Sequence, residues 1–364
     1  MEIISTGYAY FLMNMPIPKA FAHFIESNED TWSLQESAEN NLGSFPPRGR
    51  EIFLPNEYYG LDLIVKKFIG IDPAKPLKFG LPHGVEIGDA KFGNVYGYRI
   101  NLGTITYNNE IGYQNIVKHK VPGRRIYIEH PFLLLLEMMH SLNLLSQKAQ
   151  REATLFFPAH RDKTHNFVNK KYDEDLCSKL MSRREKEGEI EISLPLLDFE
   201  IGRHKKYESY GFKVVSSGHR NDPKFLSRFI NLVTSYKQVA SAEVGSHLVY
   251  SAATGAKTIF WDVGLSLVQL VDDKKSLTAP YEIDSSVREL LGEGQIIDKE
   301  VAIKLLGWRG TPPAQISWQK LYRSSAIFDF SGFVEQEGEN KTLSVPRVFQ
   351  RFVARIIKGK IASS

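Results

Sequence analysis

The sequence is poor in cysteine and has no long uninterrupted apolar run. It contains one cysteine, Cys177, so an internal disulfide and a metal site built from several thiolates are both excluded. Its most apolar stretch, residues 131–139, contains Glu137 and is well short of the roughly 18 apolar residues that suggest a membrane-spanning helix. The N-terminal residues lack the basic start and apolar run of a secretory signal. We therefore expect a cytoplasmic protein in a reducing compartment.

Neither sign of charge is in large excess. The 46 Lys and Arg residues nearly balance the 42 Asp and Glu residues, which leaves a formal net charge of +4. A nucleic-acid-binding surface needs a concentrated basic face with interleaved aromatic side chains, and here the basic residues are dispersed except near the C-terminus. We therefore do not expect nucleic acid as a partner. A chain of 364 residues with 42% hydrophobic side chains is long enough for two packed cores.

The second half of the chain alternates between short apolar runs and longer helical patterns. One helix is predicted over 173–187 with Gly188 as its stop, and a charged helical stretch is predicted to end at Gly211. A further helix has Asp222 as N-cap and Pro223 at its first position. Strands joined by single crossover helices form a parallel, doubly wound sheet, because right-handed crossovers place helices on both of its faces. The five strands are predicted over 154–157, 189–194, 212–216, 237–240 and 257–261.

The first half shows a shorter version of the same pattern. Strands are predicted over 77–81, 104–107 and 125–129, with a helix over 109–119. A polar segment, residues 146–153, separates the halves. The sequence therefore predicts an α/β fold with two facing Rossmann-like domains, parallel sheets and a cleft between them. The domains are expected over 1–145 and 154–335.

A basic amphipathic helix is predicted near the C-terminus, over residues 347–360 of a final segment spanning 336–364. One of its faces is apolar, and the other carries five Lys and Arg residues and no acid. This pattern suits the surface of an anionic membrane, and it also suits a closing helix that packs on the protein. Both interpretations remain open.

Polar and ionisable residues follow four of the five predicted strands. In an open parallel sheet, ligands bind beyond the carboxyl ends of the strands. The start of the helix after the fourth strand offers backbone N–H groups and a positive dipole end, which favour a phosphate or a carboxylate. Its serine is equally typical of a simple N-cap. The candidate donor- or phosphate-binding residues are His160, Arg161, His219, Arg220, Glu243, Gly245, Ser246 and His247.

A histidine follows the first predicted strand of the chain, in the stretch "PHGVEIGDA". His83 in such a loop can titrate near neutral pH and take a proton from a substrate hydroxyl. Glu86 or Asp89 could do so instead, or could orient the imidazole. The alternative is a turn that carries a surface histidine. We expect the catalytic residues among these three.

At these motifs the sequence resembles the bacterial glycosyltransferases of capsule and O-antigen synthesis that have the GT-B architecture. The resemblance covers about residues 77–262, through "PHGVEIGD", "IEHPFL", "LFFPAHR", "GFKVVSSGHRNDPKF" and "SAEVGSHLVYSAATGAKTIF". More distantly the sequence is similar to CDP-glycerol glycerophosphotransferases and to sialyltransferases of the same fold. The resemblance implies acceptor activation by His83, and contact of the nucleotide phosphate with His219, Ser246 and His247. It implies neither a metal ion nor a cofactor.

The resulting hypothesis is a glycosyltransferase with a nucleotide-sugar donor and a glycan or lipid-linked acceptor. We expect a metal-independent, inverting reaction and a cytoplasmic enzyme at the inner face of the cell membrane. Two alternatives stay open: an isomerase like the nucleotide-sugar 2-epimerases, and a non-catalytic subunit that binds nucleotide or glycan. A dehydrogenase is disfavoured because no G-x-G-x-x-G follows a predicted strand. The sugar, the nucleotide, the acceptor, the linkage and the oligomeric state are not predicted.

Overall fold

The computed structural model describes about half of the chain, in separate ranges between residues 48 and 307. The chain divides into two units, Met1–Ala326 and Ile327–Ser364, and every described residue belongs to the first. The helices predicted over 109–119 and 347–360 lie outside the described residues, and the proposed domain boundaries stay predictions. The described residues are 48–51, 54–77, 79–81, 84–85, 99–100, 103–107, 125–141, 144–145, 151–158, 170–242, 245–261, 263 and 296–307.

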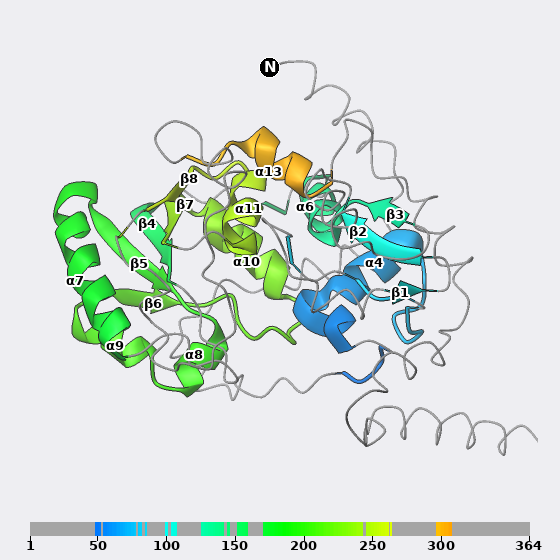
Figure 1. The fold of residues 1–364 in the computed structure, drawn as a ribbon, viewed down its shortest axis with the longest axis horizontal. Coiled ribbons are helices and arrows are strands. Elements are labelled where there is room, and N and C mark those ends of the chain that lie inside the picture. Colours follow the sequence, from blue (N-terminus) through cyan, green and yellow to red (C-terminus); the bar gives the residue numbers. More distant parts are fainter. Residues whose placement is uncertain are drawn as a thin grey trace, which may run out of the picture. The chain divides into compact units, whose positions relative to one another are not determined.

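The largest sheet among the described residues has five parallel strands (Figure 1). Its order is β6-β5-β4-β7-β8, and each neighbouring pair is parallel. This is the 3-2-1-4-5 order of a Rossmann-type sheet, and the direction of strand addition reverses between β4 and β7. The prediction of a parallel α/β sheet is confirmed. The strands are β4 (Arg151–Phe157), β5 (Glu189–Ser193), β6 (Lys213–Val215), β7 (Tyr236–Ser241) and β8 (Thr258–Phe260).

Helices cover both faces of this sheet (Figure 1). Successive residues of a strand point to opposite faces, and β4 ends with Phe156 and Phe157. Phe156 packs with α7, whereas the Phe157 ring lies 5.8 Å from the ring of Phe229 in α10. The sheet is therefore doubly wound, as predicted. The helices around it are α7 (Lys170–Glu187), α8 (Leu196–Glu200), α9 (His204–Ser209), α10 (Phe225–Thr234), α11 (Ser246–Ala253) and α13 (Lys299–Leu305).

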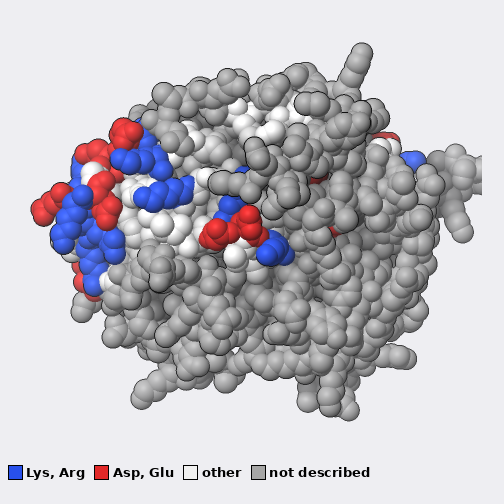
Figure 2. Space-filling view, turned by 90° about the horizontal axis from the view of Figure 1, so that it is seen from above, with Lys and Arg blue, Asp and Glu red and all other residues white. Residues whose placement is uncertain are grey.

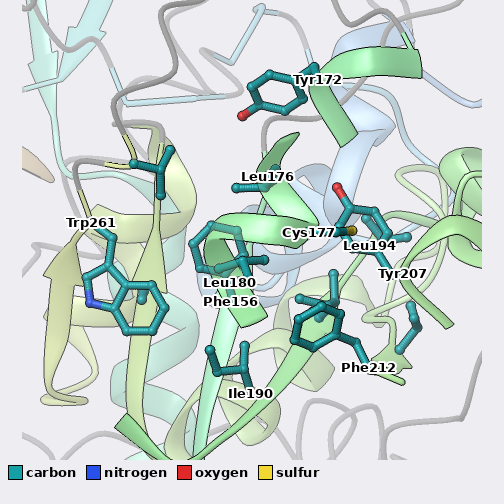
Figure 3. Packing of buried hydrophobic residues seen from close by; sticks show 14 of the residues in the cluster. Phe156, Tyr172, Leu176, Cys177, Leu180, Ile190, Leu194, Tyr207, Phe212 and Trp261 are labelled. Atoms are coloured by element: carbon teal, nitrogen blue, oxygen red, sulfur yellow. The ribbon is translucent and has the colours of Figure 1, made fainter. Parts of the chain in front are cut away.

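The core between the sheet and α7 is built from fully buried side chains (Figure 3). Leu176 and Leu180 of α7 lie one turn apart and pack towards Ile190 of β5. Burying each such side chain contributes roughly 1.5–3 kcal/mol. Cys177 lies in the same cluster, and burial, followed by the charge of Asp173, raises the pKa of its thiol to about 12. The single cysteine is therefore a protonated core residue.

The outer surface of α7 carries charges of both signs. Figure 2 shows Lys and Arg side chains beside Asp and Glu side chains on the described part of this face. Arg184 bonds Glu189 at 2.7 Å, and Lys206 bonds Glu174 at 2.6 Å. Exposed pairs of this kind contribute little to stability. Because positive and negative side chains alternate, the described part of this face has no electrostatic potential of a single sign.

A second, three-stranded sheet precedes the first in the sequence. Strand β2 (Gly103–Tyr107) pairs antiparallel with β1 (Arg99–Ile100) and parallel with β3 (Arg125–Ile128). The strands predicted over 104–107 and 125–129 are therefore confirmed to within one residue. The prediction of parallel sheets is wrong for this one, which is mixed because β1 runs antiparallel to β2. After β3 the chain enters α6 (Pro131–Ser141), with proline at its first position.

The first strand predicted in the chain is not formed in the described residues. Leu77, Phe79 and Leu81 are fully buried, but their backbones are bound by side chains rather than by a neighbouring strand. The Leu77 N–H donates to Glu51 at 3.0 Å, while the Asn56 amide donates to the Phe79 carbonyl at 2.8 Å and accepts from Leu81 N–H at 2.7 Å. The alternation of apolar residues correctly predicted that these side chains are buried. It wrongly predicted that their backbone pairs with a neighbouring strand.

Two helices in this part of the chain were not predicted. The 3-10 helix η1 (Leu54–Gly60) leads directly into α4 (Leu61–Ile69). Leu61, Asp62 and Lys66 of α4 are all buried, and Lys66 forms ion pairs with Asp62 and Glu51. The apolar residues Leu61, Ile64, Val65 and Phe68 have the i, i+3, i+4, i+7 spacing of an amphipathic helix, so the sequence does carry a local signal for α4.

Three boundaries differ from the prediction. Strand β4 begins at Arg151, inside the predicted polar linker 146–153. Its first two residues are exposed and polar, so the sequence pattern did not distinguish them from a linker. The charged stretch before Gly211 forms two helices, α8 and α9, rather than one. The predicted N-cap Asp222 lies outside its helix, since α10 begins at Phe225. Within the described ranges, no helix is both long and apolar enough to cross a membrane.

Candidate functional site

The ends of β4 and β7 are joined through side chains at the point where the strand order reverses. The Ser241 hydroxyl donates to the Phe157 carbonyl at 2.7 Å. The same oxygen lies 3.0 Å from Nε2 of His247. Because the hydroxyl hydrogen points to Phe157, Nε2 of His247 donates to Ser241. His247 is therefore held at the carboxyl edge of the sheet, where ligands of this sheet type bind.

Helix α11 begins directly after this edge. Gly245 has an extended backbone, with φ −147° and ψ 179°, and precedes the first helical residue, Ser246. A Cβ on Gly245 would lie 2.9 Å from Cε1 of the His247 ring. The glycine thus leaves room for the histidine ring. Gly245, Ser246 and His247 are all partly exposed, so the helix start is open to solvent.

The hydroxyl of Ser246 contacts a distant part of the chain. It accepts the backbone N–H of Val85 at 2.9 Å. A Cβ on Gly84 would lie 3.1 Å from the same oxygen, so the two segments are in close contact. Gly84 and Val85 directly follow the predicted acceptor-side histidine, His83. The structure therefore brings the neighbours of that histidine to the helix predicted to bind phosphate.

One turn along α11, Tyr250 joins the same cluster. Nδ1 of His130 accepts the N–H of Phe132 at 3.0 Å, so Nε2 carries the proton of the neutral ring and donates to the Tyr250 oxygen at 2.9 Å. Burial raises the pKa of the Tyr250 phenol well above its ordinary value, and a hydrogen bond with Ser246 opposes that rise. Tyr250 is therefore protonated at any physiological pH.

The loop after β6 contains the predicted pair His219 and Arg220. Nδ1 of His219 accepts the N–H of Asn221 at 3.1 Å, so Nε2 is the donor nitrogen of the neutral ring. The Arg220 guanidinium is exposed and lies over the ring of Tyr58, 4.9 Å from its centroid. It offers a charge-assisted donor to an anion at the protein surface.

Asp222 belongs to the interior of this loop. Its carboxylate forms a buried ion pair with Arg228 of α10, and one of its oxygens also accepts the N–H of Lys224 at 2.9 Å. Arg228 donates in addition to the Ser217 carbonyl at 3.0 Å. The ion-pair partner of Asp222 is therefore Arg228 and not its sequence neighbour Arg220. The ion pair fixes the backbone from which His219 projects.

A second segment packs against this loop from the η1–α4 junction. The Tyr59 N–H donates to the Arg220 carbonyl, and the Tyr59 ring lies 4.9 Å from the ring of Phe225. Tyr59 has φ +60°, in the left-handed region that non-glycine residues rarely adopt. Burial raises the pKa of its phenol. Sequence reasoning missed these tyrosines, and the Tyr-Tyr-Gly motif at a helix boundary is the only local signal for them.

The remaining predicted site residues lie outside the described part of the chain. They are His83, Glu86, Asp89, His160, Arg161 and Glu243. Of the predicted set, the structure places His219 and Arg220 on one loop, and Gly245, Ser246 and His247 on another. Among the described side chains, no group of three or more His, Cys, Asp or Glu residues is arranged to hold a metal ion.

Comparison with known proteins identifies no close relative. No protein-family model matches the sequence, and no curated protein matches it. A crystal structure of TarM is similar with a TM-score of 0.29 and 11% sequence identity over 74% of this chain. The match spans about half of TarM, 51% of its chain. A TM-score of this size assigns neither a fold nor a function.

Proposed function

We propose that this chain is a glycosyltransferase with the two facing Rossmann-like domains of the GT-B type. It transfers a sugar or a related group from a nucleotide-activated donor to a hydroxyl of a surface polysaccharide or a lipid-linked glycan. The hydrogen bond from Val85 to Ser246 is the observation that carries the proposal. It joins the segment after His83 to a helix start at the reversal point of the sheet, where such folds bind nucleotides.

The donor phosphate is proposed to lie at the start of α11, against backbone N–H groups and the positive end of the helix dipole. The acceptor oxygen bonds to the sugar carbon while the bond from that carbon to the phosphate oxygen breaks. Negative charge then accumulates on the departing nucleotide. Nε2 of His219 and the guanidinium of Arg220 supply donors for that charge.

His83 is proposed to take the proton of the acceptor hydroxyl, with Glu86 or Asp89 orienting its imidazole. One displacement with a base inverts the configuration at the sugar carbon. Glu243 is assigned to the ribose or the base of the donor. His160 and Arg161, after β4, are assigned to its phosphates.

A nucleotide panel tests donor binding. Thermal unfolding is measured with CMP-, CDP-, UDP- and GDP-linked compounds, and one nucleotide class is expected to raise the melting temperature by mass action. A donor at 100 times its Kd stabilises the folded state by about 2.7 kcal/mol. The absence of a shift for every compound contradicts the proposal.

His83→Ala then tests the chemistry. Transfer is expected to fall by roughly 10²–10⁴-fold, the usual contribution of a general base, while donor binding is retained. His140→Ala is the matched control, because His140 is an exposed histidine on α6. Unchanged function in His83→Ala would favour the non-catalytic subunit. Conversion of the donor sugar without any acceptor would favour the isomerase.

Contact with an anionic membrane through the helix predicted over 347–360 is part of the same proposal. It places the enzyme beside a lipid-linked acceptor at the inner face of the cell membrane. The basic face of that helix supports it, since lysine and arginine near an anionic surface each contribute about 1 kcal/mol.

A further inference from the structure

We infer that Ser246 is a positioning residue whose hydroxyl anchors the Gly84–Val85 segment to α11 and does not bind the donor phosphate. The inference rests on the proposed function, because that function gives the segment after His83 its role beside the acceptor. The anchor itself is a contact between described residues. It reverses the role that the sequence suggested for this serine.

The contact is close and links residues that are far apart in the chain. The Val85 N–H donates to the Ser246 oxygen at 2.9 Å across 161 positions of the sequence. A Cβ on Gly84 would lie 3.1 Å from that oxygen, so an added side chain leaves little room for the hydroxyl. Val85 is buried, whereas Ser246 is partly exposed.

The Ser246 hydroxyl bonds to two groups of the protein, the Val85 N–H and the Tyr250 phenol. A serine hydroxyl has one donor and two acceptor positions. One acceptor position receives Val85 N–H. The Tyr250 phenol, one turn along α11, is the second group that bonds Ser246. The same phenol oxygen accepts Nε2–H of His130, so the hydroxyl is one link in a chain from Val85 to α6.

The backbone of this helix start offers an anion a donor other than the Ser246 hydroxyl. The first amides of a helix have no intrahelical acceptor, and they point out of its N-terminal end. The backbone N–H of Ser246, the first residue of α11, is such a donor. A phosphate bound to it leaves the Ser246 side chain in its contact with Val85. Removal of the hydroxyl should then alter the placement of the acceptor-side segment and not the affinity for donor.

Three variants test this division of roles. Ser246→Ala removes the acceptor of Val85 N–H, and Ser246→Thr restores a hydroxyl at the same position. Ser251→Ala is the matched control, because Ser251 lies on the same helix and its hydroxyl donates to the His247 carbonyl at 2.7 Å. Hydrogen exchange of the Val85 amide reports the anchor. Donor Kd, kcat and the KM for acceptor report its consequence.

Ser246→Ala is expected to speed exchange of the Val85 amide by about five- to tenfold, as for one lost hydrogen bond. The expected kinetic change is a fall in kcat with the donor Kd unchanged. Ser246→Thr should restore both the wild-type kcat and the slow exchange of the Val85 amide. A large loss of donor affinity with Val85 exchange unaltered would show that Ser246 is a phosphate ligand and overturn the inference. If no nucleotide binds the wild-type protein, the proposed function fails, whereas the exchange measurement still decides whether the anchor exists.

Discussion

Two consecutive residues with left-handed backbones, Tyr59 and Gly60, hold the η1–α4 junction against the loop that carries His219. The φ angle is +60° for Tyr59 and +74° for Gly60. A tyrosine in this region costs of order 1–3 kcal/mol and persists only where the surroundings impose it. Here its N–H donates to Arg220 and its ring packs on Phe225. The strained residue is thus stabilised by the loop proposed to contact the leaving phosphate.

Gly60 tests how closely these segments fit. A Cβ at this position would lie 2.3 Å from the Pro223 carbonyl oxygen, a backbone atom that cannot rotate away. Gly70 is a matched control, because it has the same φ of +74° and a Cβ added there would meet no atom within 4 Å. Gly70→Ala should therefore cost only the backbone strain, about 1–2 kcal/mol.

Gly60→Ala should reduce the free energy of unfolding by clearly more than Gly70→Ala, because steric overlap adds to the same strain. Urea unfolding of both variants measures the difference. Equal losses would mean that the junction and the loop are not in contact.

At the scale of elements, the loop between β6 and α10 is fixed by one buried ion pair. Both side chains of Asp222 and Arg228 are almost completely buried, and Arg228 also bonds the Ser217 carbonyl. Asp222→Ala leaves the guanidinium in the interior without this carboxylate. The expected loss in the free energy of unfolding is about 3–5 kcal/mol, the usual result of breaking a buried pair.

The exposed pair between Glu152 and Lys237 is the control for this prediction. The two side chains are 81% and 60% exposed, so Glu152→Ala should change stability by less than about 1 kcal/mol. Denaturant unfolding compares the two variants. A small effect of Asp222→Ala would show that another group compensates the arginine.

The same scale explains which elements the sequence predicted well. All five strands of the parallel sheet were found because each is a short apolar run bounded by a helix with its own stop signal, such as Gly188 after α7. The described residues between Leu77 and Leu81 carry a similar alternation and form no strand, because Glu51 binds the backbone of Leu77 and Asn56 binds that of Phe79 and Leu81. Periodicity reports which side chains are buried. It does not report whether a neighbouring strand or a side chain binds the backbone.

At the scale of the whole molecule, a hydrogen bond connects α6, which follows the three-stranded sheet, to α11 of the five-stranded sheet. His130, at the start of α6, donates to Tyr250 of α11 across 120 positions of the chain. The Phe132 ring stacks on the same tyrosine, 4.3 Å from it. The two sheets are thus connected through buried side chains, and we expect the described part to unfold as one unit.

Tyr250→Phe keeps the stacked ring and removes the oxygen that His130 bonds. The free energy of unfolding should fall by about 1–3 kcal/mol, since a buried N–H loses this acceptor. Circular dichroism and intrinsic fluorescence, followed in the same urea titration, should still give coincident transitions. Two separate transitions in the wild-type protein would contradict a single unit.

The sequence by itself determined the parallel sheet, its two helical faces and the loops at its carboxyl edge, because apolar periodicity and glycine stops are local properties of the chain. It also identified Ser246 and the His219 loop as neighbours of that edge. The tertiary structure alone decided that Ser246 bonds Val85, that Asp222 bonds Arg228, and that Tyr59 packs on Phe225. Contacts of this kind join residues from 6 to 166 positions apart, and no local pattern records which distant segment packing brings to a side chain.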